Sequence, residues 1–200
     1  LSEIELTYFV SACYSNGLNN EEVIALTKAI VNNGNKLNLN KYPILDLHSI
    51  GGIPGNRITM IAVPIIAAAG FIIPKTSSRS ITSPSGTSDT MEVIANVSFP
   101  VNDIKKIVNK TNGCMVWGGA VNLAAADDKL IRVRNPLGLD PEGMLLASII
   151  AKKAAVNATH VLIEIPVGKN SKVENKQKAV GLKNKFIQLG KKFNIKVIIM

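Results

Sequence analysis

The sequence predicts an α/β protein whose sheet is mostly parallel and is preceded by a helical segment. Three observations lead to this prediction. The first thirty-odd residues carry apolar side chains at helical spacing, short apolar runs typical of strands begin after Tyr42, and amphipathic segments separate those runs. Strands that alternate with helices are typical of a mostly parallel sheet, and ligands bind beyond the carboxyl ends of such strands.

The N-terminal segment predicts two helices. The first spans residues 1–17 and ends at Gly17, and the second spans residues 19–34, with Asn20 as its cap. The apolar face of the first helix consists of Leu6, Phe9, Val10 and Cys13. Cys13 is therefore expected in the core and not as a reactive thiol.

The rest of the chain predicts strands that alternate with helices. The expected strands are residues 44–46, 71–73, 114–117, 160–165 and 196–200. The expected helices are residues 56–69, 88–94, 101–111, 141–156 and 174–193.

Length and composition limit the classes of protein to which the chain can belong. The 200 residues, of which 46% are hydrophobic, can bury a substantial core in one domain or two lobes. The chain begins at Leu1 without an initiator Met and ends within an apolar run, so we expect a fragment of a longer protein. The longest uncharged stretch, residues 58–73, falls short of the roughly 20 residues that a membrane helix needs. Cys13 and Cys114 predict reduced, buried thiols, which fit a cytoplasmic protein.

The formal net charge of +9 favours small anionic partners. Many lysines lie between Lys169 and Lys192, where they are expected on the solvent face of an amphipathic helix. The apolar face of that helix consists of Ala179, Leu182, Phe186, Leu189 and Phe193. A nucleic-acid surface interleaves aromatic with basic side chains, whereas both phenylalanines here belong to the apolar face. We therefore expect neither a nucleic acid nor a membrane as partner.

Two loops, each between a strand and the following helix, are suited to anions. Residues 46–57, DLHSIGGIPGNR, contain three glycines that let the backbone approach a ligand, and Ser49 adds a hydroxyl. Residues 74–90, PKTSSRSITSPSGTSDT, are rich in Ser and Thr. Arg79 can form paired hydrogen bonds with phosphate, and Thr87 lies where the next helix begins. A tight connection in the first loop and a flexible linker in the second are the alternatives.

Further polar residues carry weaker signals. Asp140 precedes a proline at an expected helix start, so a helix cap is the alternative to a catalytic role. Ser148 and Lys152 lie one helical turn apart, as a binding pair or an exposed polar pair. His48 stands beside Ser49, as a ligand contact or a positioned loop residue. Two His, two distant Cys and no clustered carboxylates predict no metal site.

Four segments together resemble the archaeal AMP phosphorylases, relatives of the thymidine and pyrimidine-nucleoside phosphorylases. The segments are HSIGGIPGN, PKTSSRSITSPSGTSDTMEV, VWGGAVNLAAADD and LDPEGMLLASIIAKK, in that family's order and approximate spacing. SSRSITS together with SIGGIPGN is the more specific feature, because the pyrimidine enzymes carry a more glycine-rich hydroxyl loop. The resemblance covers nearly the whole chain, whereas the chains of the family are much longer.

The resemblance implies a helical lobe and an α/β lobe with a substrate cleft between them. The helical lobe corresponds to residues 1–38 and 132–156, and the α/β lobe to residues 40–131 and 157–200, truncated at its C-terminal end. Asp140 matches the family's proposed proton donor. The positions that match nucleotide- or phosphate-binding residues are Gly52, Ser78, Arg79, Ser80, Ile81, Thr82, Ser83, Thr87, Ser148 and Lys172. His48, Ser49 and Lys152 are further candidates.

One position departs from the pyrimidine relatives. They have a lysine immediately before the His-Ser of the first loop, where this chain has Leu47. One cation of the phosphate pocket is therefore missing, and we expect Arg79 or Lys172 to compensate.

The implied activity is phosphorolysis of AMP or other nucleoside 5′-monophosphates. Inorganic phosphate is the co-substrate, free base and ribose 1,5-bisphosphate are the products, and no cofactor is expected. The full-length protein is expected to be a homo-oligomer. Three alternatives stay open: a pyrimidine-nucleoside phosphorylase, a phosphoribosyltransferase of similar fold that releases diphosphate and uses Mg²⁺, and a non-catalytic nucleotide- or RNA-binding module.

Overall fold

The computed structural model describes residues 1–51, 53, 56–79, 86–123, 125–169 and 171–200. Every strand pair in these residues is parallel, as predicted, but the strands form two sheets and not one. The larger sheet has the order β1–β4–β5, with the bounds Leu45–Ser49, His160–Glu164 and Lys196–Ile199. The smaller sheet pairs β2 (Ile73–Ser77) with β3 (Gly113–Trp117).

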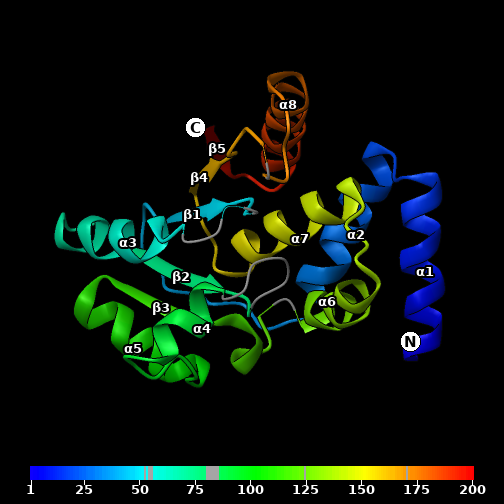
Figure 1. Cartoon of the computed structure of the whole chain (residues 1–200). Coiled ribbons are helices and arrows are strands. Elements are labelled where there is room, and N and C mark those ends of the chain that lie inside the picture. The colour runs from blue at the N-terminus through cyan, green and yellow to red at the C-terminus, as the bar shows by residue number, and fades with distance from the viewer. Residues whose placement is uncertain (52, 54–55, 80–85, 124, 170) are drawn as a thin grey trace.

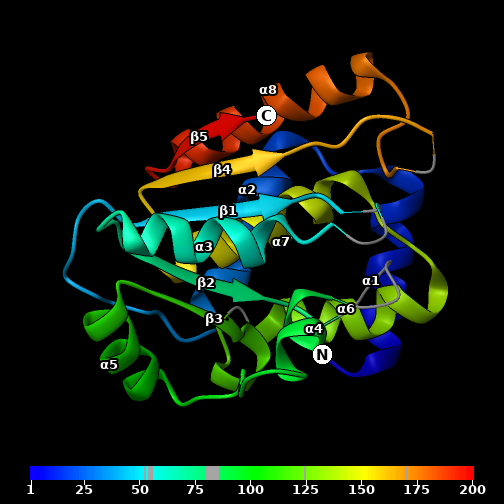
Figure 2. The ribbon, with the colours of Figure 1, turned by 60° about the vertical axis from the view of Figure 1, so that its left-hand side comes forward.

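The two sheets meet where β1 and β2 begin. An isolated parallel bridge joins Ile44 to Ile72, and the Leu45 N–H donates to the Ile72 carbonyl at 2.8 Å. Figure 2 shows the five strands side by side in the order β5, β4, β1, β2, β3, with their carboxyl ends pointing the same way. The segments that follow β1 and β2 therefore start at the same edge of the fold.

The strand expected at residues 71–73 is present, but its bounds differ, because β2 starts at Ile73 and continues through Ser77. Pro74 suggested that the hydroxyl-rich loop begins there. The Ile73 N–H donates toward the β3 side, to Asn112, at 2.8 Å, so the nitrogen of the next residue points toward β1. On that side β2 belongs to a separate sheet, and a proline that lacks an N–H is tolerated.

Helices cover both sides of the strands (Figure 1). The bounds are α3 (Ile58–Ala68), α4 (Thr87–Glu92), α5 (Val101–Thr111) and α8 (Lys176–Lys192). Helix α3 packs against β1, β2 and β3, α5 packs against β2 and β3, and α8 packs against β5 and α7. A short 3-10 helix, η1 (Gly118–Val121), follows β3.

A group of helices lies beside the sheets, on the side of the molecule opposite α3 and α5 (Figure 1). It consists of α1 (Glu3–Asn16), α2 (Asn20–Asn32), α6 (Ala125–Leu137) and α7 (Glu142–Ala155). Helix α2 packs against α7 and α6, and α1 packs against α6. The proposed boundary between the lobes, at residues 131 and 132, lies within α6.

Two local features of the N-terminal helices differ from prediction. The cap of α2 is Asn19, one residue before the predicted Asn20, because the Asn19 side chain accepts from the N–H of Glu22. In α1 the buried stripe is Leu6, Val10 and Cys13, whereas Phe9 is exposed at the edge of the stripe. Both cysteines are free thiols, with Cys13 buried, as expected, and Cys114 half-buried. Burial raises the pKa of the Cys114 thiol to about 12.

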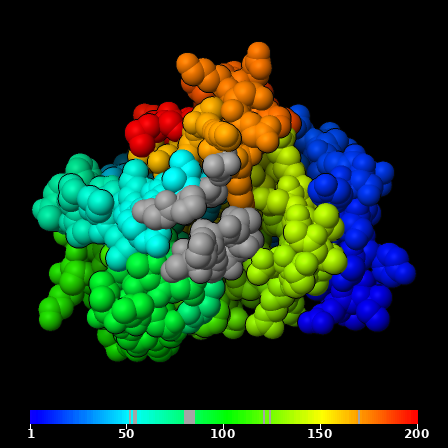
Figure 3. Space-filling model, in the orientation of Figure 1, coloured from blue at the N-terminus to red at the C-terminus, as the bar shows by residue number. Residues whose placement is uncertain are grey.

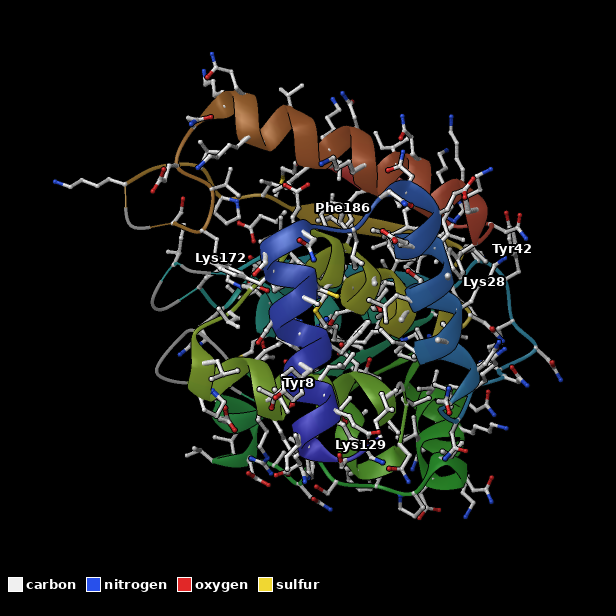
Figure 4. All side chains as sticks on the ribbon, turned by 90° about the vertical axis from the view of Figure 1, so that its right-hand side faces the viewer. Tyr8, Lys28, Tyr42, Lys129, Lys172 and Phe186 are labelled. Atoms are coloured by element: carbon white, nitrogen blue, oxygen red, sulfur yellow. The ribbon has the colours of Figure 1, made fainter. Side chains whose placement is uncertain are left out.

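Helix α8 confirms the predicted amphipathic pattern. Leu182, Phe186 and Leu189 are buried, and Ala179 and Phe193 pack against the core. Figure 4 shows that amine-tipped side chains project from the outer side of α8, while Phe186 lies beneath it. Within the described residues, none of the helices combines the length and the apolar character needed to cross a membrane.

Candidate active site

Every predicted site residue that the structure describes lines one pocket at the carboxyl ends of β1 and β2. These residues are His48, Ser49, Ser78, Arg79, Thr87, Asp140, Ser148, Lys152 and Lys172. Gly52, Ser80, Ile81, Thr82 and Ser83 lie outside the described residues. Figure 3 shows the face on which the cyan segment after β1, the yellow-green α6–α7 region and the orange stretch after β4 meet. The pocket therefore lies between the sheets and the helical group.

The first wall is built by the end of β1 and the loop that follows it. Gly51 has a φ of +87°, which lets the chain turn sharply after the strand. The Ser49 hydroxyl accepts from the Asn56 side-chain amide at 3.2 Å, and that amide also donates to Glu164 of β4 at 3.0 Å. The side-chain oxygen of Asn56, Oδ1, accepts from the Ile58 N–H at 3.0 Å, at the start of α3. Asn56, which sequence reasoning did not single out, thus fixes the loop to two elements.

The second wall is built by the end of β2 and the start of α4. The hydroxyl groups of Ser77 and Ser88 lie 2.6 Å apart and share a hydrogen bond. Thr87 is the first residue of α4 and lines the pocket beside Ser78. The wall therefore presents hydroxyl groups and the first turn of a helix to the pocket, as the hydroxyl-rich sequence predicted.

Arg79 is engaged with carboxylates of α4. Its guanidinium donates to the two Glu92 oxygens at 2.5 and 2.9 Å and to Asp89 at 3.0 Å. The same group lies 4.7 Å from the centre of the Trp117 ring. These contacts hold the end of β2 against α4 and β3. The role of Arg79 as a phosphate ligand remains a prediction.

The third wall comes from α6 and α7. Asp127, which is buried, accepts from the Ser148 hydroxyl at 2.8 Å and pairs with the Lys152 amine at 2.6 Å. The Lys152 amine also donates to the Ser148 hydroxyl at 3.1 Å. Ser148 is buried, so the alternative of an exposed polar pair is wrong. Asp127 was missed because its AADD segment was not recognised as the start of a helix.

Asp140 lies between two cations in the turn from α6 to α7. Its carboxylate accepts from Arg134 of α6 and, at 2.8 Å, from the amine of Lys172, which lies between β4 and α8. The cap position of α7 is Pro141, which makes no side-chain cap, so the alternative of Asp140 as a helix cap is wrong. Arg134 is buried and was missed, although it stands only six residues before Asp140.

The floor of the pocket, between β1 and β2, holds a buried charge cluster. Asp46 and Lys153 are both fully buried at their side chains and form an ion pair at 2.9 Å. The Lys75 amine donates to the Leu47 carbonyl at 2.8 Å and lies 3.8 Å from Asp46. The Lys153 amine reaches the same carbonyl at 3.3 Å. None of these four residues was a predicted site residue, although Leu47 was noted as a departure.

The positive surroundings also act on His48. Burial, followed by the charges of Lys153, Lys75, Lys152 and Lys172, holds the pKa of His48 well below its ordinary value of 6.5. The imidazole is therefore neutral at pH 7, with one nitrogen able to donate and the other to accept a hydrogen bond. In a pocket rich in cations, a neutral donor adds hydrogen bonding for an anion without adding charge.

These features define the class of protein. Hydroxyl groups and cations converge on a pocket beyond the carboxyl ends of parallel strands, which is where α/β proteins bind their ligands. Residues 41–178 match the family model described as the glycosyl transferase family, a/b domain. The chain belongs to this family.

Relatives within the family make the comparison more specific. The chain is 52% identical over 197 residues to an AMP phosphorylase of Methanococcus maripaludis, and the match covers 98% of this chain and 39% of that protein. It is 53% identical over 192 residues to an AMP phosphorylase of Pyrococcus furiosus, covering 96% of this chain and 38% of that protein. The predicted resemblance to the archaeal AMP phosphorylases is confirmed. The chain spans about two fifths of the length of these relatives.

Solved structures share the fold at low sequence identity. Anthranilate phosphoribosyltransferase from Saccharomyces cerevisiae in complex with PRPP and Mg matches with a TM-score of 0.73 and 16% identity, over 98% of this chain and 52% of that one. The enzyme from Thermus thermophilus matches with a TM-score of 0.67 and 16% identity, over 95% of this chain and 60% of that one. At this identity the likeness establishes the fold, as predicted.

Proposed function

We propose that the full-length protein catalyses phosphorolysis of AMP. Inorganic phosphate attacks C1′ of the nucleotide, adenine departs, and ribose 1,5-bisphosphate is formed. The similarity to AMP phosphorylases over almost the whole chain carries this proposal, and the pocket supports it. The reaction brings two anions together, the co-substrate phosphate and the 5′-phosphate, so the pocket must offer both neutral donors and cations.

Displacement at C1′ leads to a proposal for which reactant contacts which wall of the pocket. The attacking phosphate and the departing base lie on opposite faces of the sugar. Asp140, proposed as the proton donor to the base, belongs to the turn between α6 and α7. The co-substrate phosphate is therefore proposed to bind at the other walls, against the ends of β1 and β2, where Ser49, Ser77 and Thr87 line the pocket. Holding the reactants in this alignment can lower the barrier by about 7–11 kcal/mol.

The remaining parts of the proposal concern the whole protein. Ser148, Lys152 and Lys172, on the side of Asp140, are proposed to bind the nucleotide. We further propose that the whole protein binds phosphate, acts in AMP catabolism, is cytoplasmic and assembles into a homo-oligomer. The proposed reaction uses no metal ion and no organic cofactor.

The test is chromatographic detection of free base from a panel of nucleoside 5′-monophosphates, using the full-length protein. We expect base release from AMP only when phosphate is present. Uridine with phosphate tests for a pyrimidine-nucleoside phosphorylase, and phosphoribosyl diphosphate with Mg²⁺ and a base tests for a phosphoribosyltransferase. Absence of base release from every monophosphate, together with salt-sensitive RNA binding, would favour a binding module instead.

Replacing Arg79 by alanine is expected to raise KM for phosphate or AMP about tenfold, with a smaller effect on kcat, because a charged hydrogen-bond donor is lost from the wall of the pocket. Steady-state kinetics of the full-length protein measure this. Glu92→Gln serves as the comparison, because it weakens the same ion pair from the other side. A ligand role predicts that Glu92→Gln leaves both KM values near normal, whereas a tethering role predicts that it reproduces Arg79→Ala. Unchanged KM values for both substrates in Arg79→Ala would refute a binding role.

A further inference from the structure

The Lys75 side chain connects β2 to β1 at a point where a continuous sheet would have main-chain hydrogen bonds. Three residues beyond the Ile44–Ile72 bridge, Leu47 on β1 is level with Lys75 on β2. The strands there belong to separate sheets, and the Leu47 carbonyl accepts from the Lys75 amine at 2.8 Å. This amine lies in the floor of the pocket, on the wall assigned above to the co-substrate phosphate.

The Lys75 amine has hydrogen-bonding capacity left for a ligand. A protonated lysine carries three N–H donors. In the part of the chain that the structure describes, this amine donates to the Leu47 carbonyl and lies beside the Lys153 amine, which reaches the same carbonyl. The nearest Asp46 oxygen, at 3.8 Å, is beyond hydrogen-bonding distance. The side chain is nevertheless only 5% exposed. A buried ammonium with free donors facing a pocket is suited to an anion.

The balance of charges beneath the pocket also favours binding of an anion at Lys75. Asp46 forms its closer ion pair with Lys153, at 2.9 Å, and also accepts from the Leu47 N–H at 2.7 Å. A single carboxylate therefore faces two buried amines. Burial and the charge of Lys153 outweigh Asp46 and lower the pKa of Lys75 from 10.5 to about 7. A dianion in the pocket would supply the counter-charge that Lys75 lacks.

Other charged groups around Lys75 do not remove this imbalance. The titratable and charged groups that face it from the surrounding elements and across the pocket are Asp46, His48, Arg57, Arg79, Cys114, Arg134, Asp140, Lys152, Lys153 and Lys172. His48 is neutral near pH 7, and Asp140 is already paired with Arg134 and Lys172. The other carboxylates near the pocket are also paired, Asp127 with Lys152, and Asp89 and Glu92 with Arg79. The pocket around Lys75 is thus positive before any ligand enters.

We propose that Lys75 is a binding residue for the co-substrate phosphate. This inference rests on the proposed function for the identity of the anion. It adds a third candidate to Arg79 and Lys172 for the cation absent at Leu47, and those two side chains are already paired with carboxylates. The Lys75 amine comes from the neighbouring strand, level with Leu47.

The kinetic test is Lys75→Met, which keeps the length of the side chain and removes the amine. We expect KM for phosphate to rise about 10- to 100-fold, as for the loss of a charge-assisted hydrogen bond, while KM for AMP changes less than threefold. Lys28→Met, at an exposed position on α2 (Figure 4), is the matched control and should leave both values unchanged. A normal phosphate KM, or a rise confined to AMP, would overturn the proposal.

The binding test needs no catalysis. Sulfate is the probe, because unlike phosphate it does not titrate near neutral pH. Calorimetric titration of the full-length protein at pH 8, in two buffers of different ionisation enthalpy, gives the number of protons taken up per sulfate bound. Because the pKa of Lys75 is lowered to about 7, we expect more proton uptake at pH 8 than at pH 6, where Lys75 is already largely charged. His48 is neutral at pH 8 and lines the same pocket, so the same titration of Lys75→Met is needed to assign the proton to Lys75.

The outcomes separate the two proposals. Sulfate binding to the folded Lys75→Met protein with unchanged affinity would refute the role of Lys75. Proton uptake in the original protein that is lost in Lys75→Met would support it, even if no nucleotide were cleaved. Release of adenine from AMP with phosphate supports the proposed function independently of Lys75.

Discussion

Asparagine in place of Asp140 is expected to lower kcat for AMP phosphorolysis by about 10²–10⁴-fold, with a much smaller change in KM for AMP. Adenine leaves poorly as an anion, so a proton delivered to its ring lowers the barrier. The substitution keeps the size of the side chain and removes the carboxyl group that would carry the proton. Steady-state kinetics of the full-length protein with AMP and phosphate measure both parameters.

The two cations at Asp140 make a further comparison necessary. Arg134 and Lys172 both bind its carboxylate, so Asp140→Asn also deprives them of a counter-charge. A nucleotide whose base already carries a positive charge, such as 7-methylguanosine 5′-monophosphate, needs no protonation. If Asp140 is the proton donor, this substrate should recover most of the lost kcat. If Asp140 only holds the two cations in place, both substrates should lose activity equally.

The control for this prediction is Glu142→Gln, two residues away on α7. Glu142 is half exposed and pairs with Lys185 of α8, outside the pocket. Its loss should leave kcat within about twofold, since exposed ion pairs contribute little. Near-normal turnover in Asp140→Asn would remove Asp140 from the mechanism.

Asp46→Asn is expected to destabilise the protein by about 3–5 kcal/mol, because it leaves buried amines without their carboxylate. Lys153 loses an ion pair in which both side chains are fully buried, and Lys75 loses its nearest negative charge. Urea denaturation of the full-length protein, compared at pH 6 and pH 9, gives the free energies of unfolding. Asp103→Asn is the control, because Asp103 pairs with Lys106 at the surface and should cost less than about 1 kcal/mol.

The expected pH dependence of this loss of stability follows from the lowered pKa of Lys75. Its pKa is lowered from 10.5 to about 7, so between these values the folded protein binds fewer protons than the unfolded protein. The penalty for burying this amine is therefore full below about pH 7 and declines as the pH rises toward 10.5. At pH 6 the variant retains two uncompensated amines, whereas at pH 9 Lys75 is largely neutral. The loss of stability should be larger at pH 6, and an equal loss at both values would contradict the described cluster.

The sequence was most informative where a pattern is local. Helix α5 spans the predicted residues, since its apolar positions repeat at helical spacing and Pro100 precedes it. The two loops were identified by composition and by their place after a strand. Because the carboxyl ends of parallel strands share one edge, their described residues meet in a single pocket.

The missed features depend on contacts between distant segments. The buried face of helix α6 includes the charged residues Asp127 and Arg134, so the sequence of this helix lacks a regular apolar pattern. Each is buried because its partner lies on another element or turn: Asp127 pairs with Lys152, and Arg134 with Asp140. Lys75 stands next to a proline and a run of hydroxyl residues that suggested a loop. Its importance depends on being level with Leu47 of another strand, which no local pattern contains.

The single backbone bridge between β1 and β2 has a consequence for how the site can change. In an unbroken sheet, main-chain hydrogen bonds would dictate how far apart the two anion-binding loops stand. Here the Lys75 side chain of β2 reaches across to a main-chain carbonyl of β1. The distance between the two loops therefore depends on one amine, which a single substitution can replace while both loop sequences stay intact.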